Sequence, residues 1–330
     1  MKIAIIGGGS WGTALALLLA DKGNEVWVWT PESDVVEDIR ANHRNSRYLP
    51  DVELPKGVWA AGDMGEVVDE AGAVVLAVPS SAIRQVAEQL ADVWTAEALL
   101  INAGKGLESL TGLRLSQVIS EAIPEAAHRV VVLSGPNLAV EVARRVPTAT
   151  VVASRDEESA MSAQELFGCA YLRVYRSSDV IGVELGGALK NVIAIGAGIS
   201  DGMGFGDNSK ATLITRGLVE MMRLGEALGA QARTFTGLAG VGDLMATCAS
   251  RLSRNLRVGI ALGRGMNVDQ ALESVKQVAE GVPTCRAAYN LAATYRIYAP
   301  ITEQLYLVLF EGKSPQDALA DLMLREPKAE

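Results

Sequence analysis

Residues 1–23 read MKIAIIGGGSWGTALALLLADKG and carry the pattern that decides the fold of the first half of the chain. An apolar run at 2–6 has the character of a buried strand, a glycine cluster follows it, and a helical period then runs to Leu19. Gly23 lies just past this period and marks the end of the helix. A second strand, EVWVWT, occupies 25–30. The stretch therefore predicts a β-turn-α-β unit of about the length that binds a dinucleotide.

The glycine cluster contains the spacing G-x-G-x-x-G at residues 7–12. This spacing is weak by itself, but a strand before it and a helix after it are the context that indicates a dinucleotide site. Gly7 would permit the tight turn, Gly9 would let the backbone approach a pyrophosphate, and Gly12 would let the helix pack on the sheet. The alternative is a glycine-rich turn with a purely structural role.

The end of the second strand, W-T-P-E at 29–32, bears on the choice of dinucleotide. An acid there usually binds the ribose of NAD, whereas arginine accommodates the 2′-phosphate of NADP. Glu32 would repel a phosphate if it pointed inward, although it could instead be the acid of a first helical turn. The nearby cations that could compensate are Arg40, Arg44 and Arg47. The pattern leans slightly to NADH.

Apolar runs typical of strands recur up to residue 176, and helical segments such as 81–92 and 112–122 separate several of them. These runs are 57–61, 73–78, 98–102, 129–134, 148–154 and 171–176. Strands that alternate with helices favour a mostly parallel, doubly wound sheet.

After about residue 180 long helical periods dominate. The predicted helices are 180–199, 209–229, 253–263, 268–276, 283–296, 301–311 and 315–324, and residues 325–330 are expected to form a solvated tail. We therefore predict an α/β protein with a Rossmann-like, dinucleotide-binding domain over 1–180. An all-α domain over 181–330 is expected to bind the substrate and carry the catalytic residues.

The composition argues against several classes of protein. The net charge of −9 disfavours a general nucleic-acid or anionic-membrane surface. Three dispersed cysteines and only two histidines indicate reduced thiols and no metal site. The N-terminus enters a strand at once, without a signal peptide, and no apolar run is expected to reach the length of a membrane span. We expect a soluble, cytoplasmic protein.

Two lysines stand in unusual surroundings. Lys105, within INAGKGLE, follows a strand and would lie at the carboxyl edge of the sheet, where open α/β sheets bind ligands, unless it is a plain surface lysine. Lys190 is the only cation between Glu184 and Ile199, and its neighbours on a helical face are apolar. Such an amine either reaches out to water or acts as a general acid–base.

The stretch GLAGVGDLMATCASRLSRNLRVG, residues 237–259, is the other candidate region. Its glycines at 237, 240 and 242 predict a flexible segment that allows close approach, and Asp243 follows them. Ser253 has the character of a helix N-cap with Arg254 and Asn255 in the first turn. Arginine is electrostatically poor there, but a bound anion would reverse the penalty, because arginine can hold phosphate bidentately and asparagine can add an N–H donor.

The chain resembles the bacterial glycerol-3-phosphate dehydrogenase family over nearly its whole length. The shared motifs are GGGSWGTALA, NAGKGLE, LSGPNLAVEV, VELGGALKNVIAIGAGISDGMGFGDNSKATLITRGL, GLAGVGDLMATC, SRN and EGVPT, in the family's order. The resemblance implies reversible, NAD(P)H-dependent reduction of dihydroxyacetone phosphate to sn-glycerol 3-phosphate for phospholipid synthesis. It implies no nucleic-acid partner and no membrane insertion, and it leaves the oligomeric state open, a homodimer included.

The resemblance also implies roles for individual residues. Lys190 would donate and accept the proton, Lys105 would orient the substrate, and Asp243 would hold Lys190 or a substrate hydroxyl. Further substrate contacts would come from Gly135, Asn137, Thr247, Ser253, Arg254 and Asn255. Cofactor contacts would come from Gly7, Gly9, Ser10, Trp11, Gly12, Tyr48, Lys105, Ala139, Arg254, Val278 and Glu280, with His43 and Arg44 nearby.

The chain departs from the family pattern at two places, and two other functions stay open. Asn137 stands where many members have serine or threonine, and Thr30-Pro31 replaces more usual basic or small residues, which puts NADPH preference in question. Gly186 and Gly187, one turn before Lys190, are expected to leave room for the substrate beside the amine. The alternatives are a related hydroxy-acid dehydrogenase, which needs a carboxylate clamp, and a non-catalytic dinucleotide-sensing protein.

Overall fold

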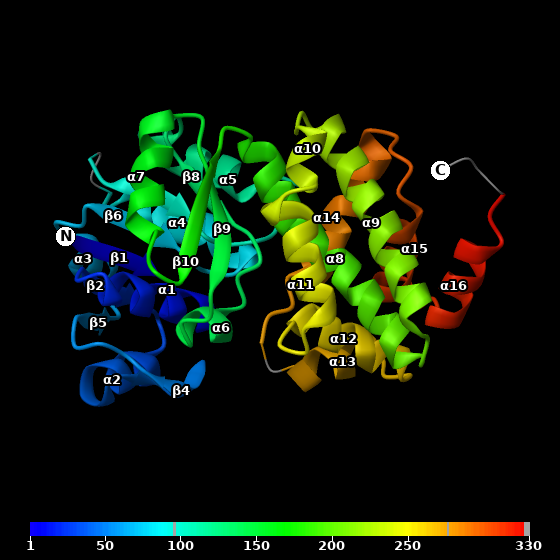
Figure 1. The fold of residues 1–330 in the computed structure, drawn as a ribbon, viewed down its shortest axis with the longest axis horizontal. Coiled ribbons are helices and arrows are strands. Elements are labelled where there is room, and N and C mark those ends of the chain that lie inside the picture. Colours follow the sequence, from blue (N-terminus) through cyan, green and yellow to red (C-terminus); the bar gives the residue numbers. More distant parts are fainter. Residues whose placement is uncertain (95–96, 276, 327–330) are drawn as a thin grey trace. The chain divides into compact units, whose positions relative to one another are not determined.

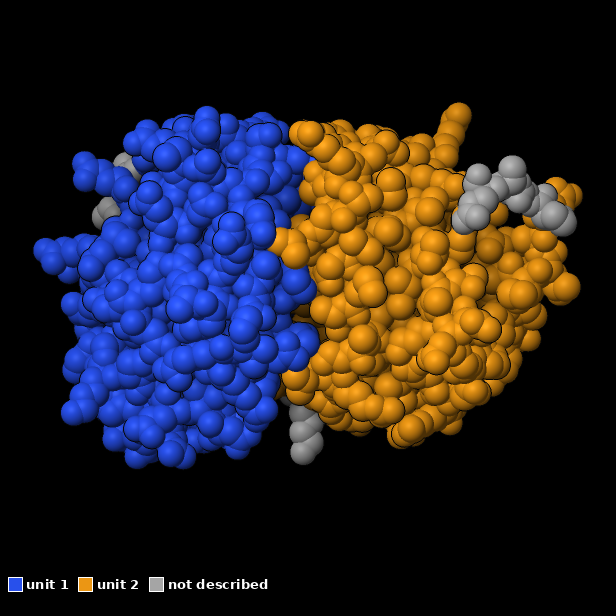
Figure 2. Space-filling model, in the orientation of Figure 1, with its two compact units in different colours: residues 1–105, 113–184 blue, residues 106–112, 185–330 orange. Residues whose placement is uncertain are grey.

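The computed structural model describes residues 1–94, 97–275 and 277–326. The chain forms two compact units, coloured separately in Figure 2. Unit 1 comprises Met1–Lys105 and Leu113–Glu184, and unit 2 comprises Gly106–Gly112 and Leu185–Glu330.

Unit 1 is built on an eight-stranded sheet with the order β10-β9-β8-β7-β6-β1-β2-β5 (Figure 1). Its strands are β1 Lys2–Ile6, β2 Glu25–Trp29, β5 Val58–Ala61, β6 Ala73–Leu76, β7 Leu99–Asn102, β8 Val131–Ser134, β9 Thr148–Ala153 and β10 Leu172–Ser177. All neighbouring pairs are parallel except β8 with β9. The predicted strands and the mostly parallel sheet are thus confirmed.

The sheet of unit 1 is covered on both faces because successive side chains of a strand point to opposite sides. Ile3 and Ile5 of β1 belong to one apolar cluster, whereas Ala4 and Ile6 belong to another. The helices are α1 Ser10–Asp21, α2 Ser33–Asn42, α3 Met64–Val68, α4 Ile83–Ala91, α5 Leu115–Ala122, α6 Ala139–Ala143 and α7 Glu157–Phe167. The arrangement is the predicted Rossmann-like, doubly wound fold.

A short antiparallel hairpin was missed by the sequence analysis. It pairs β3 Arg44–Asn45 with β4 Leu49–Glu53 directly after α2. β3 has only two residues, both polar, and β4 (LPDVE) contains a proline and two acids, so neither has the apolar run or regular alternation by which strands are predicted.

Unit 2 is helical, as predicted. Its helices are α8 Val180–Gly202, which begins within unit 1, then α9 Asp207–Ala227, α10 Ala232–Phe235, α11 Asp243–Ala249, α12 Arg254–Gly263, α13 Val268–Val275, α14 Gly281–Thr294, α15 Pro300–Phe310 and α16 Pro315–Met323. Residue 276 of one predicted helix and residues 327–330 of the predicted tail lie outside the described residues. The glycine segment expected to be flexible forms a π-helical turn, η3 Leu238–Gly242, and the short helices α10 and α11 were not predicted.

Helix α8 corrects the expectation that no apolar run reaches the length of a membrane span. It is 23 residues long, with a mean hydropathy of 1.5 in its most apolar window. However, 94% of that window is buried inside the protein, as in the core helix of a globular domain. Length and composition alone are therefore weak evidence for a membrane span here.

A buried carboxylate of unit 2, that of Glu220 on α9, forms hydrogen bonds with the start of α15. Its oxygens accept hydrogen bonds from the backbone N–H groups of Ile301 and Thr302 and from the Thr302 hydroxyl, at 2.7, 3.0 and 3.0 Å. Burial raises the pKa of Glu220, while these three bonds act in the opposite direction. The side chain supplies the acceptors that a helix N-terminus needs.

We expect Glu220→Gln to lower the free energy of unfolding by about 1–3 kcal/mol. The amide keeps one acceptor oxygen and presents an –NH₂ group to donors, so at least one buried N–H or O–H loses its partner. Urea denaturation followed by circular dichroism measures the loss. Glu226→Gln, at an exposed position of the same helix, is the control and should change stability little. Equal stability of both variants would contradict the role of Glu220.

Candidate active site

The glycine turn lies at the carboxyl edge of the unit 1 sheet, between β1 and α1. Gly7 has φ of 122°, and a Cβ there would lie 2.7 Å from the carbonyl oxygen of Ala77. A Cβ at Gly12 would collide with the carbonyl oxygen of Gly7 and press on Ile5 of the sheet. Gly9 faces open space, with nothing within 4 Å of a Cβ position. The first N–H groups of α1 therefore border a free surface, which is the arrangement that suits a pyrophosphate.

Ser10, Tyr48 and Glu32 are linked at the same edge of the sheet. The Ser10 hydroxyl donates to the carbonyl oxygen of Tyr48 at 2.9 Å, and the Tyr48 hydroxyl donates to Glu32 at 2.5 Å. The Thr30 hydroxyl also donates to the Glu32 carboxylate, at 2.9 Å. Burial raises the pKa of the Tyr48 hydroxyl, and the bond to Glu32 adds to this shift. Glu32 thus stays at the end of β2 and makes no capping bond to α2.

The three cations near this edge differ in their partners. Arg40 donates to the carbonyl oxygen of Ala60 at 2.6 Å and pairs with Glu66 at 3.4 Å. Arg47 forms ion pairs with Asp34 at 3.2 Å and with Glu32 at 3.6 Å. Arg44 is exposed in β3, directly after His43, which adopts φ of 50° at the end of α2. Two of the three predicted compensating arginines therefore already face carboxylates.

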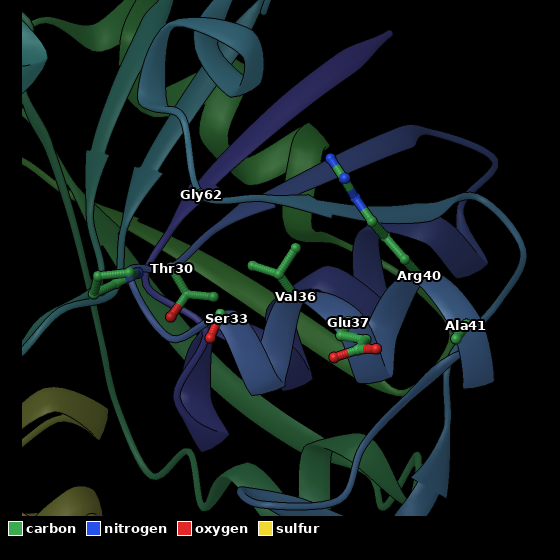
Figure 3. Close-up of a pocket in the computed structure, with 8 residues that line it drawn as sticks. Thr30, Ser33, Val36, Glu37, Arg40, Ala41 and Gly62 are labelled. Atoms are coloured by element: carbon green, nitrogen blue, oxygen red, sulfur yellow. The ribbon is translucent and has the colours of Figure 1, made fainter.

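A pocket of about 490 Å³ opens beside the end of β2 (Figure 3). It is lined by Thr30, Pro31, Ser33, Val36, Glu37, Arg40, Ala41 and Gly62. Most of this lining comes from α2, and the pocket lies on the side of the glycine turn where the second strand ends. It is a candidate for the adenosine end of a dinucleotide.

Lys105 and Gly135 are brought together at the carboxyl ends of β7 and β8. The Lys105 ammonium donates to the carbonyl oxygen of Gly135 at 2.7 Å. Asn137, two residues further on, lies on the same loop, and Ala139 begins α6. The Trp11 indole donates to the carbonyl oxygen of Ala103 at 3.1 Å, which links the glycine turn to the strand before Lys105. The unit 1 residues of the predicted set therefore gather at one edge of the sheet.

In unit 2, Lys190 is buried and paired. Its side chain is 8% exposed, and its ammonium donates to Asp243 at 2.9 Å and to the Thr247 hydroxyl at 2.7 Å. Asp243 and Thr247 lie four residues apart on α11 and so share a face of that helix. The alternative that Lys190 reaches out to water is wrong. The apolar neighbours of Lys190 on α8 were identified from the sequence. Its hydrogen-bond partners were not, because they lie on a different helix, α11.

Gly186 serves helix packing and does not leave room for a substrate. A Cβ there would lie 2.5 Å from the carbonyl oxygen of Ala239 in η3. Gly240 in turn packs against the backbone of Phe235. The π-helical turn therefore occupies the space beside Gly186 that the sequence analysis assigned to the substrate, and it leads directly into Asp243.

The Ser253-Arg254-Asn255 segment begins α12. The Ser253 hydroxyl accepts from the N–H of Leu256 at 3.2 Å, which confirms the predicted N-cap. Asn255 is buried, donates to Asn191 at 2.8 Å and accepts from the N–H of Gly281 at 2.9 Å. This amide therefore joins α12 to α8 and α14.

The Arg254 guanidinium makes no hydrogen bond to any residue in the described ranges. Arg254 is exposed, yet nearby protein atoms desolvate its guanidinium and lower the pKa of Arg254, while the charge of Glu280 opposes the shift. Glu280 directly precedes α14, and Val278, two residues earlier, is exposed. A guanidinium with this freedom is well suited to hold an anion.

The described residues contain no cluster of histidine, cysteine, aspartate or glutamate that could hold a metal ion. Burial raises the pKa of the Cys248 thiol to about 12, against the opposing charge of Lys190. The thiol is thus protonated at neutral pH and is not a nucleophile. Two polar residues that contact the predicted set, Asn191 and Thr150, were missed. Asn191 could have been identified from the sequence, because it is a polar amide directly after Lys190 in an otherwise apolar helix.

Both halves of the chain are similar to domains of known proteins. Domains described as the N-terminus and the C-terminus of NAD-dependent glycerol-3-phosphate dehydrogenase match residues 2–160 and 179–320. The chain is 50% identical over 331 residues to glycerol-3-phosphate dehydrogenase (NAD(P)+) of Syntrophotalea carbinolica, covering 100% of this chain and 99% of that protein. It is also 50% identical over 330 residues to the enzyme of the same name from Geobacillus thermodenitrificans, covering 100% and 96%.

A solved structure gives the same result in three dimensions. The crystal structure of glycerol-3-phosphate dehydrogenase from Coxiella burnetii matches with a TM-score of 0.94 and 40% identity, covering 98% of this chain and 99% of that one. The two family domains cover both halves of the chain, and the chain aligns with its relatives over nearly their full length. The chain therefore belongs to the NAD-dependent glycerol-3-phosphate dehydrogenase family.

Proposed function

We propose that the protein catalyses the reversible reduction of dihydroxyacetone phosphate to sn-glycerol 3-phosphate. When bound, the nicotinamide of NAD(P)H supplies the hydride. The observation that carries the proposal is the buried Lys190 ammonium, held by Asp243 at 2.9 Å and Thr247 at 2.7 Å. Such an ammonium can give its proton to the oxygen of a carbonyl as that oxygen becomes an alkoxide.

The remaining residues of the site bind and orient. Arg254 provides a guanidinium for the phosphate, at a distance from the reacting carbon, and orientation of this kind can contribute several kcal/mol. Lys105 orients the substrate from the unit 1 sheet edge. The open face of Gly9 beside the start of α1 suits the pyrophosphate of the cofactor. We propose that the product is used for phospholipid synthesis and that the enzyme is located in the cytoplasm.

The test is the oxidation of NADH and NADPH in parallel, with dihydroxyacetone phosphate as the acceptor. Turnover with this substrate and little turnover with 2-keto acids is the expected result. Turnover with keto acids alone would identify a hydroxy-acid dehydrogenase. Cofactor binding without turnover of any acceptor would identify a dinucleotide sensor.

We propose that NADH is preferred over NADPH because Glu32 is fixed at the end of β2 by the Thr30 and Tyr48 hydroxyls. A 2′-phosphate near this carboxylate would be repelled. We expect Glu32→Gln to reduce the preference, measured as the ratio of kcat/KM values, by roughly five- to tenfold, which corresponds to about 1 kcal/mol of charge repulsion. Most of the change should be a gain with NADPH.

Asp34→Asn is the matched control for Glu32→Gln. It removes one negative charge that also pairs with Arg47, but its carboxylate is more exposed and does not contact Thr30 or Tyr48. The cofactor ratio of this variant should stay near that of the wild type. A wild-type enzyme without cofactor preference, or a Glu32→Gln enzyme with the wild-type ratio, would remove Glu32 from cofactor selection.

A further inference from the structure

Asn45 is a buried asparagine of the β3–β4 hairpin that reaches the glycine turn. It is 1% exposed, and its side-chain nitrogen donates to the carbonyl oxygen of Gly8 at 2.7 Å and to the Thr13 hydroxyl at 2.8 Å. The Thr13 hydroxyl in turn donates to the Gly8 carbonyl oxygen at 3.3 Å. The carbonyl group in the middle of the turn thus has two side-chain donors, one from the hairpin and one from α1.

The partners of Asn45 allow only one orientation of its amide. The Gly8 carbonyl oxygen can only accept, so the end of the amide that faces it is the –NH₂ group. The backbone N–H of Tyr48 can only donate, and it lies 3.3 Å from the amide oxygen. An amide turned the other way would place oxygen against oxygen and donor against donor. The Gly8 carbonyl group is therefore held by a donor whose orientation is fixed from both ends.

The direction of the Gly8 carbonyl group sets the direction of the Gly9 N–H group. Both belong to one planar, trans peptide unit, in which C=O and N–H point in opposite directions. Because the carbonyl group points to the buried Asn45, the Gly9 N–H points away from it. This N–H makes no hydrogen bond to any residue that the structure describes, and Gly9 is half-buried beside open space. The turn therefore presents a free donor just before the start of α1.

The peptide unit between Gly8 and Gly9 needs such a restraint. Neither residue has a Cβ, so this unit can turn over at a small steric cost. The hairpin holds the turn at a second point, where the Ser10 hydroxyl donates to the carbonyl oxygen of Tyr48 at 2.9 Å. That bond lies beyond the peptide unit and does not set its direction. The bonds to the Gly8 carbonyl oxygen are thus the ones that do.

We propose that Asn45 is a positioning residue that directs the Gly9 N–H toward the pyrophosphate of the dinucleotide. The inference rests on the proposed function, which places the pyrophosphate at the open face of Gly9. A peptide unit turned over would present the Gly8 carbonyl oxygen to the anionic oxygens and repel them. Asn45 is buried on the other side of this unit, so it acts on cofactor affinity through Gly8 and does not touch the cofactor itself.

The first test is Asn45→Ala, with Kd for NADH measured by calorimetry in the absence of substrate. We expect Kd to rise about five- to thirtyfold, the range for loss of a buried hydrogen bond that orients a binding group. Affinity for ADP-ribose, which contains the pyrophosphate, should fall in parallel. Affinity for adenosine, which lacks it, should stay near that of the wild type. The kcat at saturating NADH and KM for dihydroxyacetone phosphate should change less than about twofold.

Asn24→Ala is the matched control for Asn45→Ala. The amide of Asn24 also donates to a backbone carbonyl oxygen of unit 1, that of Leu19 at 2.9 Å, but at the opposite end of α1 from the glycine turn. Its removal takes away a bond of the same kind without reaching Gly8. Kd for NADH in this variant should stay within about twofold of the wild-type value.

The second test changes Thr13, the other donor to the Gly8 carbonyl oxygen. Thr13→Val keeps the branched shape and should raise Kd for NADH by about two- to tenfold, whereas Thr13→Ser keeps the hydroxyl and should bind NADH like the wild type. An unchanged Kd in Asn45→Ala, or in Thr13→Val if Asn45→Ala does not fold, would overturn the proposal. An equal loss of affinity for adenosine and ADP-ribose would also overturn it, because it would show general damage to the cofactor site. Failure of the proposed function shows separately, because the wild type would then bind NADH without reducing dihydroxyacetone phosphate.

Discussion

Lys190→Ala is expected to lower kcat for dihydroxyacetone phosphate reduction by about 10²–10⁴-fold, the range for loss of a general acid. The ammonium is the buried cation of a three-residue cluster with Asp243 and Thr247. Without it, the alkoxide that forms at the reacting carbon has no positioned proton donor from this cluster. Steady-state kinetics with saturating NADH measure the effect.

The Lys190 variant also removes the ammonium that pairs with the buried carboxylate of Asp243, and breaking a buried ion pair can destabilise a protein by several kcal/mol. Circular dichroism and NADH binding must therefore show that the variant is folded. Lys210→Ala is the matched control, because this lysine of α9 also forms an ion pair, with Asp201 at 2.8 Å, but lies outside the cluster. Partial recovery of Lys190→Ala by added primary amines would support a proton-transfer role. Near-normal turnover in Lys190→Ala would exclude Lys190 as the acid.

Arg254→Ala should raise KM for dihydroxyacetone phosphate by about 10–100-fold with a smaller change in kcat. A charge-assisted, bidentate contact to phosphate contributes roughly 1.5–3 kcal/mol, and the guanidinium makes no competing hydrogen bond within the described ranges. Initial rates at varied substrate concentration give both constants. Arg254→Lys keeps the charge but loses the bidentate geometry, and it should fall between the wild type and the alanine variant.

Arg257→Ala, one turn further along α12, is the control for Arg254→Ala. Arg257 is also an exposed arginine of this helix, but it lies beyond the first turn. Its removal should leave KM for the substrate within about twofold, as is usual for a surface substitution. A wild-type KM in Arg254→Ala would place the phosphate elsewhere. A raised Kd for NADH with an unchanged substrate KM would assign Arg254 to the cofactor alone.

Strands and long helices were predictable because each has a strong periodic signal. The strand at 2–6 is apolar at nearly every position, and the long helical period from 180 became α8. The hairpin at 44–53 and the π-helical turn at 238–242 had no such signal. Short elements of this kind are decided by tertiary contacts, such as the packing of Gly240 against the Phe235 backbone.

Candidate residues of the site could be named from the sequence, but the contacts that join them could not. Lys190 was identified from its apolar helix face, yet its bonds to α11 depend on how two helices pack. Asn255 was expected to donate to the phosphate. In the structure its amide nitrogen donates to Asn191 and its amide oxygen accepts from Gly281, both in unit 2. Thr150 was missed because a threonine in a β-branched strand looks like any other strand residue.

Burial protects the thiol of Cys248, which directly follows Thr247 on α11, from oxidants. Cys248 is fully buried and its pKa is raised to about 12, and Cys285 on α14 is fully buried as well, with a raised pKa. Peroxides and thiol reagents attack the exposed thiolate form, which neither residue offers in the folded state. Cys248 can therefore lie close to Lys190, the proposed proton donor, and remain a protonated thiol while it is buried.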